Sequence, residues 1–199
     1  MRNLETSFQI VTTQQRLELA GRKIREPAFR QNKGLGNEVG YYIFDYPAQD
    51  ELLVRDWIRD MQRKNSPALD GCALTVFDLY DTLMELLEEE DALEDFFSLE
   101  RRGGMDAVAR EMHCWLFEED AFLVNRIKER TPEHAVVFLT GVGKCYPALR
   151  SHNVLNNLHQ VLDHVPVVMF FPGIYSGQEL MLFGSVKDNN YYRAFRLTE

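Results

Sequence analysis

The chain has 199 residues, of which 45% are hydrophobic and 27% charged, and it carries a net charge of −9. These values fit one globular domain and exclude wholesale disorder. Proteins that bind nucleic acid need positive charge to displace counterions from phosphates, so the acidic balance argues against direct DNA binding.

The three cysteines, Cys72, Cys114 and Cys145, form no CxxC pair. A structural zinc site needs four ligands, usually at short paired spacing, so we expect reduced thiols packed as small hydrophobic side chains. Free thiols are typical of the cytoplasm. The first residues lack the apolar stretch of a signal peptide, and no apolar run reaches the roughly 20 residues of a membrane span. We therefore expect a cytoplasmic protein without membrane contact or cofactor.

The first quarter of the chain predicts one or two helices, a loop and a strand. Residues 4–25 show an imperfect helical pattern, which Pro27 ends. Three glycines at 34–40 give a loop that can reach positive φ. The aromatic and β-branched run at 41–45 predicts a buried strand.

Helices and one more strand follow. Residues 50–64 predict a helix with Asp50 as its N-cap, and 72–77 predict a second strand. Asp81 is the expected N-cap of the next helix. Helical patterns then continue over about 81–130, too long for one simple crossover, so we expect a helical insertion there.

Residues 133–175 read as a β-α-β unit. An apolar run is followed by a glycine turn, a helix with Ser151 as the expected N-cap, and a second apolar run. Two last strands, at 180–183 and 191–196, are separated by a polar loop, which predicts an antiparallel hairpin.

Strands that alternate with helices predict a mostly parallel sheet with helices on both faces. The sequence thus predicts a single α/β domain over 1–199. It combines a mostly parallel central sheet flanked by helices, a helical insertion at about 81–130 and a C-terminal antiparallel edge hairpin.

Asp45 and Asp78 each end a predicted strand. Ligands bind at the carboxyl ends of parallel strands, so the pair could hold a metal ion for phosphoryl transfer. The alternative is that each carboxylate caps the helix or turn that follows. We favour the alternative, because no third acidic residue ends a later strand.

The segment Gly141-Val-Gly-Lys144 resembles the end of a phosphate-binding loop. That motif needs a glycine five positions before the Gly-Lys pair, and Ser or Thr after the lysine. This chain has Phe138 and Cys145 at those positions. We therefore expect no NTPase activity, although Lys144 and Arg150 could contact an anion.

Polar side chains gather where the following helix begins. No Gly-x-Ser-x-Gly frame surrounds Ser151, so a hydrolase triad is not expected. Asparagine has low helix propensity, which favours specific hydrogen bonds either within the protein or to a partner. The candidate contact or ligand residues are Asp45, Asp78, Lys144, Arg150, His152, Asn153 and Asn157. None is assigned a catalytic, cofactor-binding or metal-binding role.

Five uncommon stretches occur in order along nearly the whole chain. They are Gly34-Leu-Gly-Asn-Glu-Val-Gly-Tyr-Tyr-Ile-Phe-Asp-Tyr46, Phe138-Leu-Thr-Gly-Val-Gly-Lys144, Arg150-Ser-His-Asn-Val-Leu-Asn-Asn157, Pro166-Val-Val-Met-Phe-Phe-Pro-Gly173 and Asn190-Tyr-Tyr-Arg-Ala-Phe-Arg196. Together they resemble the BrxB family of bacteriophage exclusion (BREX) systems.

The resemblance implies a cytoplasmic bacterial component of a phage-defence machine. That machine includes a DNA methyltransferase, a large AAA-type ATPase and an alkaline-phosphatase-like protein, PglZ. The family brings no established catalytic residues, and its members are expected to be adaptors. The resemblance therefore implies a non-catalytic scaffold whose partners are PglZ and other BREX components.

Two alternatives stay open. A metal-dependent nuclease or phosphohydrolase would use Asp45 and Asp78. A nucleotide- or nucleic-acid-binding regulator would use Lys144, Arg150 and the glycine loop at 34–40. That loop precedes a strand, whereas a dinucleotide-binding loop opens a helix.

Overall fold

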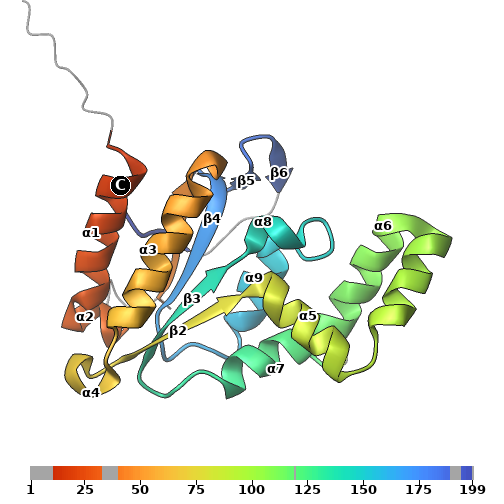
Figure 1. The fold of residues 1–199 in the computed structure, drawn as a ribbon, viewed down its shortest axis with the longest axis horizontal. Helices are drawn as coiled ribbons and strands as arrows, with labels where there is room; N and C mark the ends of the chain where they lie inside the picture. Colours follow the sequence, from red (N-terminus) through yellow and green to blue (C-terminus); the bar gives the residue numbers. More distant parts are fainter. Residues whose placement is uncertain (1–10, 33–39, 119, 189–193, 199) are drawn as a thin grey trace, which may run out of the picture.

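The computed structural model describes residues 11–32, 40–118, 120–188 and 194–198. A sheet runs through the middle of the protein, and helices cover both of its faces (Figure 1). The helices are α1 (Thr13–Arg25), α2 (Pro27–Arg30), η1 (Ala48–Asp50), α3 (Glu51–Lys64), α4 (Pro67–Asp70), α5 (Leu79–Glu89), α6 (Leu93–Phe117), α7 (Phe122–Glu129), α8 (Val142–Cys145) and α9 (Ser151–Leu158). The strands are β1 (Tyr41–Tyr46), β2 (Ala73–Asp78), β3 (Ala135–Thr140), β4 (Val167–Tyr175), β5 (Leu180–Leu182), β6 (Val186–Asp188) and β7 (Phe195–Arg196).

The main part of the sheet is parallel, in the order β2-β3-β4-β1-β7. Tyr41 lies opposite Val167 where β1 pairs with β4, and Ala73 lies opposite Ala135 where β2 pairs with β3. The central strands β3 and β4 are continuous apolar runs because side chains on both of their faces are buried. The predicted α/β class and its mostly parallel sheet are confirmed.

Each face of the sheet has its own hydrophobic core. Because successive side chains of a strand point to opposite faces, Val136 and Phe138 pack toward α1, α2 and α3. Val137 and Leu139 pack toward α5, α6, α7, α8 and α9 instead. Each fully buried side chain of this size contributes about 1.5–3 kcal/mol, so these two cores hold the layers together.

The N-terminal predictions are confirmed in part. α1 begins after a capping box, in which Thr12 and Gln15 satisfy each other's backbone N–H groups. Pro27 does not simply end the helical region, because it occupies the first turn of α2, where no N–H is needed. Asp50 precedes α3 as predicted, but its side chain accepts a hydrogen bond from Thr13 and does not cap the helix. The predicted helical residues 4–10 and the glycine loop at 34–39 lie outside the described residues.

The predicted helical insertion is confirmed as α5, α6 and α7, here called the helical lobe (residues 79–130). Gly104 interrupts α6 with φ 67° and ψ −175°, so α6 folds into two arms that extend away from the sheet (Figure 1). The prediction that Asp81 caps the first of these helices is wrong. The N-cap is Asp78, three residues earlier, and its side chain accepts from the backbone N–H groups of Tyr80 and Asp81.

The C-terminal hairpin is antiparallel, but its second strand differs from the prediction. β5 pairs antiparallel with β4 and with β6, which occupies part of the expected loop. The chain reverses early because Phe183 and Gly184 both adopt positive φ, the combination found in tight hairpin turns. β7 instead returns to the sheet and pairs parallel with β1. Residues 191–193 of the predicted last strand lie outside the described residues.

No helix in the described ranges is both long enough and apolar enough to cross a membrane.

Candidate functional site

Lys144 and Asp78 meet at the carboxyl ends of β2 and β3. The Lys144 Nζ lies 2.6 Å from Asp78 Oδ2 and 3.2 Å from Asp81 Oδ1, and 5.3 Å from the centre of the Tyr80 ring. We call Asp78, Tyr80, Asp81 and Lys144 the Asp78 cluster. Burial works against the charged ammonium, but the hydrogen bonds and charges of the two aspartates outweigh it and raise the pKa of Lys144.

Gly141 allows this cluster to form. It has φ 74°, a conformation that favours glycine, and a Cβ at this position would lie 2.3 Å from Asp78 Oδ1. The absence of a side chain therefore lets the carboxylate sit against the turn between β3 and α8. The resemblance of this turn to a phosphate-binding loop thus has a structural origin, because the glycine accommodates an aspartate of the protein itself.

Asp78 caps α5 as well as pairing with Lys144. Its Oδ1 accepts from Tyr80 N at 3.1 Å and from Asp81 N at 3.2 Å. Such caps contribute about 1 kcal/mol. The helix-cap interpretation of this aspartate is therefore confirmed, and much of its hydrogen-bonding capacity is used within the fold. Asp81, Tyr80 and Lys144 still reach the surface, and the Lys144 side chain is 35% exposed.

Asp45 is buried, and its partners come from distant parts of the chain. Its Oδ1 lies 2.6 Å from Arg16 Nη2 of α1, and its Oδ2 accepts from Tyr175 N of β4 at 2.9 Å. Arg16 also donates to the Asp45 carbonyl at 2.6 Å and lies 4.9 Å from the centre of the Phe44 ring. Asp45 therefore does not cap the following helix or turn. It fastens α1 and the end of β4 to β1.

The structure does not bring Asp45 and Asp78 together. β3 and β4 lie between the strands that carry them, so three strand spacings, about 14 Å, separate the two strand ends. A magnesium ion binds oxygen at about 2.1 Å, so one ion cannot touch both carboxylates. Among the described residues, no group of three or more His, Cys, Asp or Glu side chains is placed to hold a metal ion.

The polar residues of α9 are mostly half-buried. Arg150 occupies the N-cap position and Ser151 is the first helical residue, so the predicted cap is one position too late. Asn157 donates from Nδ2 to the Asn153 carbonyl at 2.8 Å, so part of its hydrogen-bonding capacity is satisfied within the helix. His152 is half-buried.

Arg150 is exposed beside a small hollow. It lines this hollow of about 40 Å³ together with Lys187 and Tyr146, and the lining does not include Lys144. The two cations that the sequence suggested for one anion site therefore do not share this hollow. Contacts of Lys144 and Arg150 with a partner remain predictions.

The cysteines are not joined in disulfides, in keeping with the predicted reduced thiols. Cys72 and Cys145 are buried in the two cores. Burial, with a smaller effect from the nearby Asp78 charge, raises the pKa of Cys145 to about 12. Burial also raises the pKa of Cys72. Neither thiol is in the ionised, reactive form near neutral pH.

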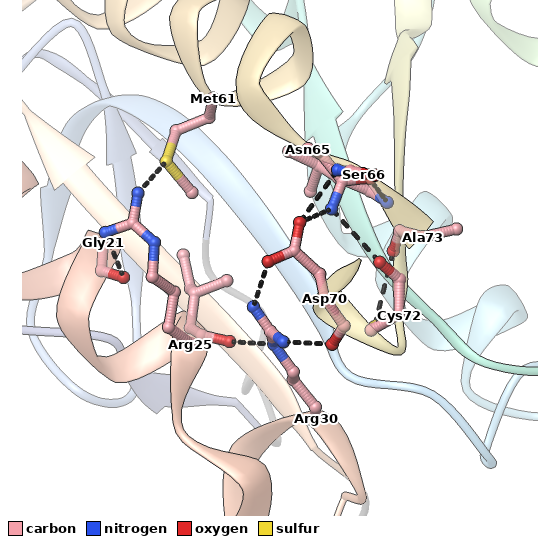
Figure 2. Close-up of polar contacts among 11 residues, drawn as sticks. Gly21, Arg25, Arg30, Met61, Asn65, Ser66, Asp70, Cys72 and Ala73 are labelled. Carbon is pink, nitrogen blue, oxygen red and sulfur yellow. Dashed lines mark hydrogen bonds and ion pairs between the residues drawn. The ribbon is translucent and has the colours of Figure 1, made fainter. Parts of the chain in front are cut away.

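Sequence reasoning missed a polar cluster at the opposite end of β2 (Figure 2). Arg30 donates to the Asp70 carbonyl at 2.5 Å, and its guanidinium lies 3.8 Å from the Asp70 carboxylate. Asn65 accepts from Leu74 N at 2.9 Å and donates to the Cys72 carbonyl at 3.1 Å. Asn65 thereby replaces a neighbouring strand at the outer edge of β2. These groups join α2, α3 and α4 to the sheet. No local sequence pattern predicts that they meet, because Arg30 and Asp70 are 40 positions apart.

The fold and site thus define an α/β sandwich with a helical lobe, whose strand-end carboxylates are held by the protein's own cations and amides. Residues 75–197 match the family model described as BREX protein BrxB. The chain is 48% identical over 181 residues to "BREX protein BrxB" of Bacillus cereus (strain H3081.97), covering 89% of this chain and 93% of the relative. A relative with the same description from Escherichia coli O9:H4 (strain HS) is 33% identical over 184 residues, covering 92% of this chain and 90% of that protein.

The chain therefore belongs to the BrxB family, and its role lies in BREX phage defence. No solved structure matches it significantly.

Proposed function

We propose that the protein is a non-catalytic adaptor or scaffold of the BREX complex, with the PglZ alkaline-phosphatase-like protein as its partner. The observation that supports this proposal is that both strand-end carboxylates, Asp45 and Asp78, are bound by other groups of the protein. Asp45 is neutralised by Arg16, and Asp78 is used by a helix cap and by Lys144. The groups that a phosphoryl-transfer enzyme would direct at its substrate are directed here at the protein itself.

The carboxyl-end surface of the sheet is the proposed contact region. Tyr80 and Tyr146 are both 39% exposed there, near the charged side chains of Lys144 and Arg150. Tyrosine is enriched in interfaces because it buries a large area at a small entropic cost. His152 and Asn153, at the start of α9, extend this proposed region.

Affinity purification from cells that carry the complete BREX system tests the proposal. The tagged protein is expected to co-purify PglZ, and Tyr80→Ala or Lys144→Glu is expected to lower the recovery of PglZ. Arg59→Glu is the matched control, because Arg59 is an exposed cation on α3, on the opposite face of the sheet. Recovery of the tagged protein only as a free monomer would contradict the adaptor role.

The enzyme alternative has a separate test at Asp78. Asparagine is as good an N-cap as aspartate, so Asp78→Asn keeps the start of α5 while removing the charge that metal chemistry requires. Full phage protection by this variant, with a normal thermal unfolding curve, would eliminate the metal-dependent hydrolase.

The regulator alternative rests on the exposed parts of Lys144 and Arg150. A ligand that binds only the folded state raises the apparent stability by mass action. A thermal-shift series with ATP, GTP and oligonucleotides therefore tests it, and no shift at millimolar ligand would count against it.

A further inference from the structure

The helical lobe carries the entire net charge of the protein. Residues 79–130 contain fifteen acidic and six basic side chains, a net charge of −9. The remainder of the chain contains sixteen of each and is neutral. The acidic density is highest at residues 88–95, where six of eight residues are acidic and none is Lys or Arg. The lobe therefore produces a strong negative field on one side of a neutral body.

A groove of about 340 Å³ lies between the two arms of α6. Ala92, Phe96 and Leu99 line it from the first arm and the turn before it, and Trp115 lines it from the second arm. The break at Gly104 creates this groove, because it turns α6 back on itself and leaves the inner sides of the arms facing each other. The remaining lining residues are the exposed charged side chains Asp95, Arg102 and Glu111.

The groove offers apolar area that the fold has not used. Trp115 packs against Phe96 and Phe122, with ring centres 5.6 Å and 4.8 Å apart, so it is held rigidly while remaining only partly buried. On the same arms, Phe97 is 44% exposed and Met105 36% exposed. A rigid aromatic side chain in an apolar groove is the usual anchor of a protein contact.

We propose that the α6 groove is the docking site for a basic amphipathic helix of a partner protein. This inference rests on the proposed adaptor function and adds the surface and the chemistry of its partner. Apolar side chains of such a helix would occupy the groove between Leu99 and Trp115. Its Lys and Arg residues would lie against the acidic residues on either side.

The charge of the lobe and the length of the first arm of α6 both favour a basic helix in the groove. The charge of −9 on the lobe attracts cationic segments and repels nucleic acid. A second copy of this chain has no net positive body to offer, because the part outside the lobe is neutral. The first arm, residues 93–103, is about 16 Å long at 1.5 Å per residue, which matches about three turns of a bound helix.

Fluorescence anisotropy with labelled synthetic peptides tests the proposal on the full-length protein. One peptide is a helical pattern of leucine and lysine, about 14 residues or roughly 21 Å long. Its counterpart has glutamate in place of every lysine. The lysine peptide is expected to bind, and more weakly as salt is added, because salt screens surface charges. The glutamate peptide is expected not to bind.

Substitutions locate the binding. Leu99→Lys places a charge in the groove. It is expected to lower the affinity for the lysine peptide at least about tenfold, or about 1.4 kcal/mol. Leu52→Lys is the matched control, because Leu52 is a 71% exposed leucine of α3 outside the lobe. If Leu99→Lys fails to fold, Glu111→Lys changes an exposed residue beside the groove and is expected to weaken binding and reduce its salt dependence.

Equal affinity for both peptides, or equal losses in Leu99→Lys and Leu52→Lys, would overturn the proposal. Sedimentation that shows a dimer dissociated by Leu99→Lys, without peptide binding, would assign the groove to a second copy. If PglZ co-purifies normally with a folded Leu99→Lys variant and the peptides do not bind, the groove inference fails while the adaptor function stands. If the lysine peptide binds in the groove but no BREX component co-purifies, the adaptor function fails instead.

Discussion

The sheet sandwich and the helical lobe use charge in opposite ways. The sandwich, meaning the residues outside 79–130, balances sixteen acidic with sixteen basic side chains and buries ion pairs such as Arg16–Asp45. The lobe has an excess of nine acidic residues. Its ion pairs have exposed acidic partners. Arg130, at the end of α7, and Glu85 of α5 are each 50% exposed, and the largely buried Arg126 pairs with the 50% exposed Glu89.

The buried charges of the sandwich stabilise the fold, whereas the exposed charges of the lobe can attract a partner. A buried pair must be complete, because an unpaired buried charge costs several kcal/mol. Exposed pairs contribute at most about 1 kcal/mol each and leave the field of the surplus acids in place. The sandwich is therefore expected to depend on its polar residues for stability, and the lobe for association.

The largest expected effect is at Asp45. Asp45→Ala leaves the largely buried Arg16 charge without its carboxylate partner and removes the acceptor of the Tyr175 N–H. We expect a loss of about 3–5 kcal/mol in the free energy of unfolding, measured by urea denaturation. Asp56→Ala is the control, because Asp56 pairs with Arg59 at the surface, and it is expected to cost less than about 1 kcal/mol. Equal losses in the two variants would refute the distinction within the sandwich.

The second effect is at Gly141. Gly141→Ala adds a Cβ 2.3 Å from Asp78 Oδ1 at a residue with φ 74°. We expect a loss of about 2–4 kcal/mol, combining backbone strain and a steric clash. Gly71→Ala separates the two causes, because Gly71 has φ 65° but a Cβ added there would meet no atom within 4 Å. That control is expected to lose only about 1 kcal/mol. The same loss in both would mean that the close approach of Asp78 has no energetic consequence.

The third effect is a loss of stability at alkaline pH, which comes from the sandwich side of the comparison. The folded pKa of Cys145 is raised from 9.0 to about 12, so the folded state keeps a proton that the unfolded state releases. The stabilisation from this thiol is complete below about pH 9 and is lost as the pH rises toward 12. Its slope can reach about 1.4 kcal/mol per pH unit.

Urea denaturation between pH 7 and pH 10 measures this slope. Cys145→Ala is expected to be less stable at every pH, because it leaves a cavity, but to lose less stability per pH unit above pH 9. Tyr41 and Tyr46, whose pKa values burial also raises, add a further decline above pH 10 in both proteins. Parallel curves for the two proteins would show that the thiol does not titrate as inferred.

The smallest effect is expected in the lobe. Glu88→Gln with Glu94→Gln removes two exposed charges from its most acidic segment. We expect the free energy of unfolding to change by less than about 0.5 kcal/mol, because surface substitutions away from specific contacts usually do. Affinity for the lysine peptide is expected to fall in the same variant. A large stability change would show that these acids are structural after all.

Much of the fold follows from local patterns in the sequence. The alternation of strands and helices predicts the parallel sheet, and the helical periodicity over 81–130 predicts the lobe. Gly103 and Gly104 signal the break in α6. The positions of Phe138 and Cys145 exclude a complete phosphate-binding loop. These features are local because glycine, hydrophobic periodicity and motif spacing act within a few residues.

The tertiary structure alone decided which residues meet. Periodicity tells which face of a strand is buried but not the order of strands, so the two strands between Asp45 and Asp78 could not be foreseen. The pairing of Asp45 with Arg16 joins residues 29 positions apart, and the Gly141 turn has its role only because Asp78 lies across from it. The sequence determined the layers and the acidic lobe, whereas long-range packing decided that the strand-end aspartates serve the fold and that α6 encloses a groove.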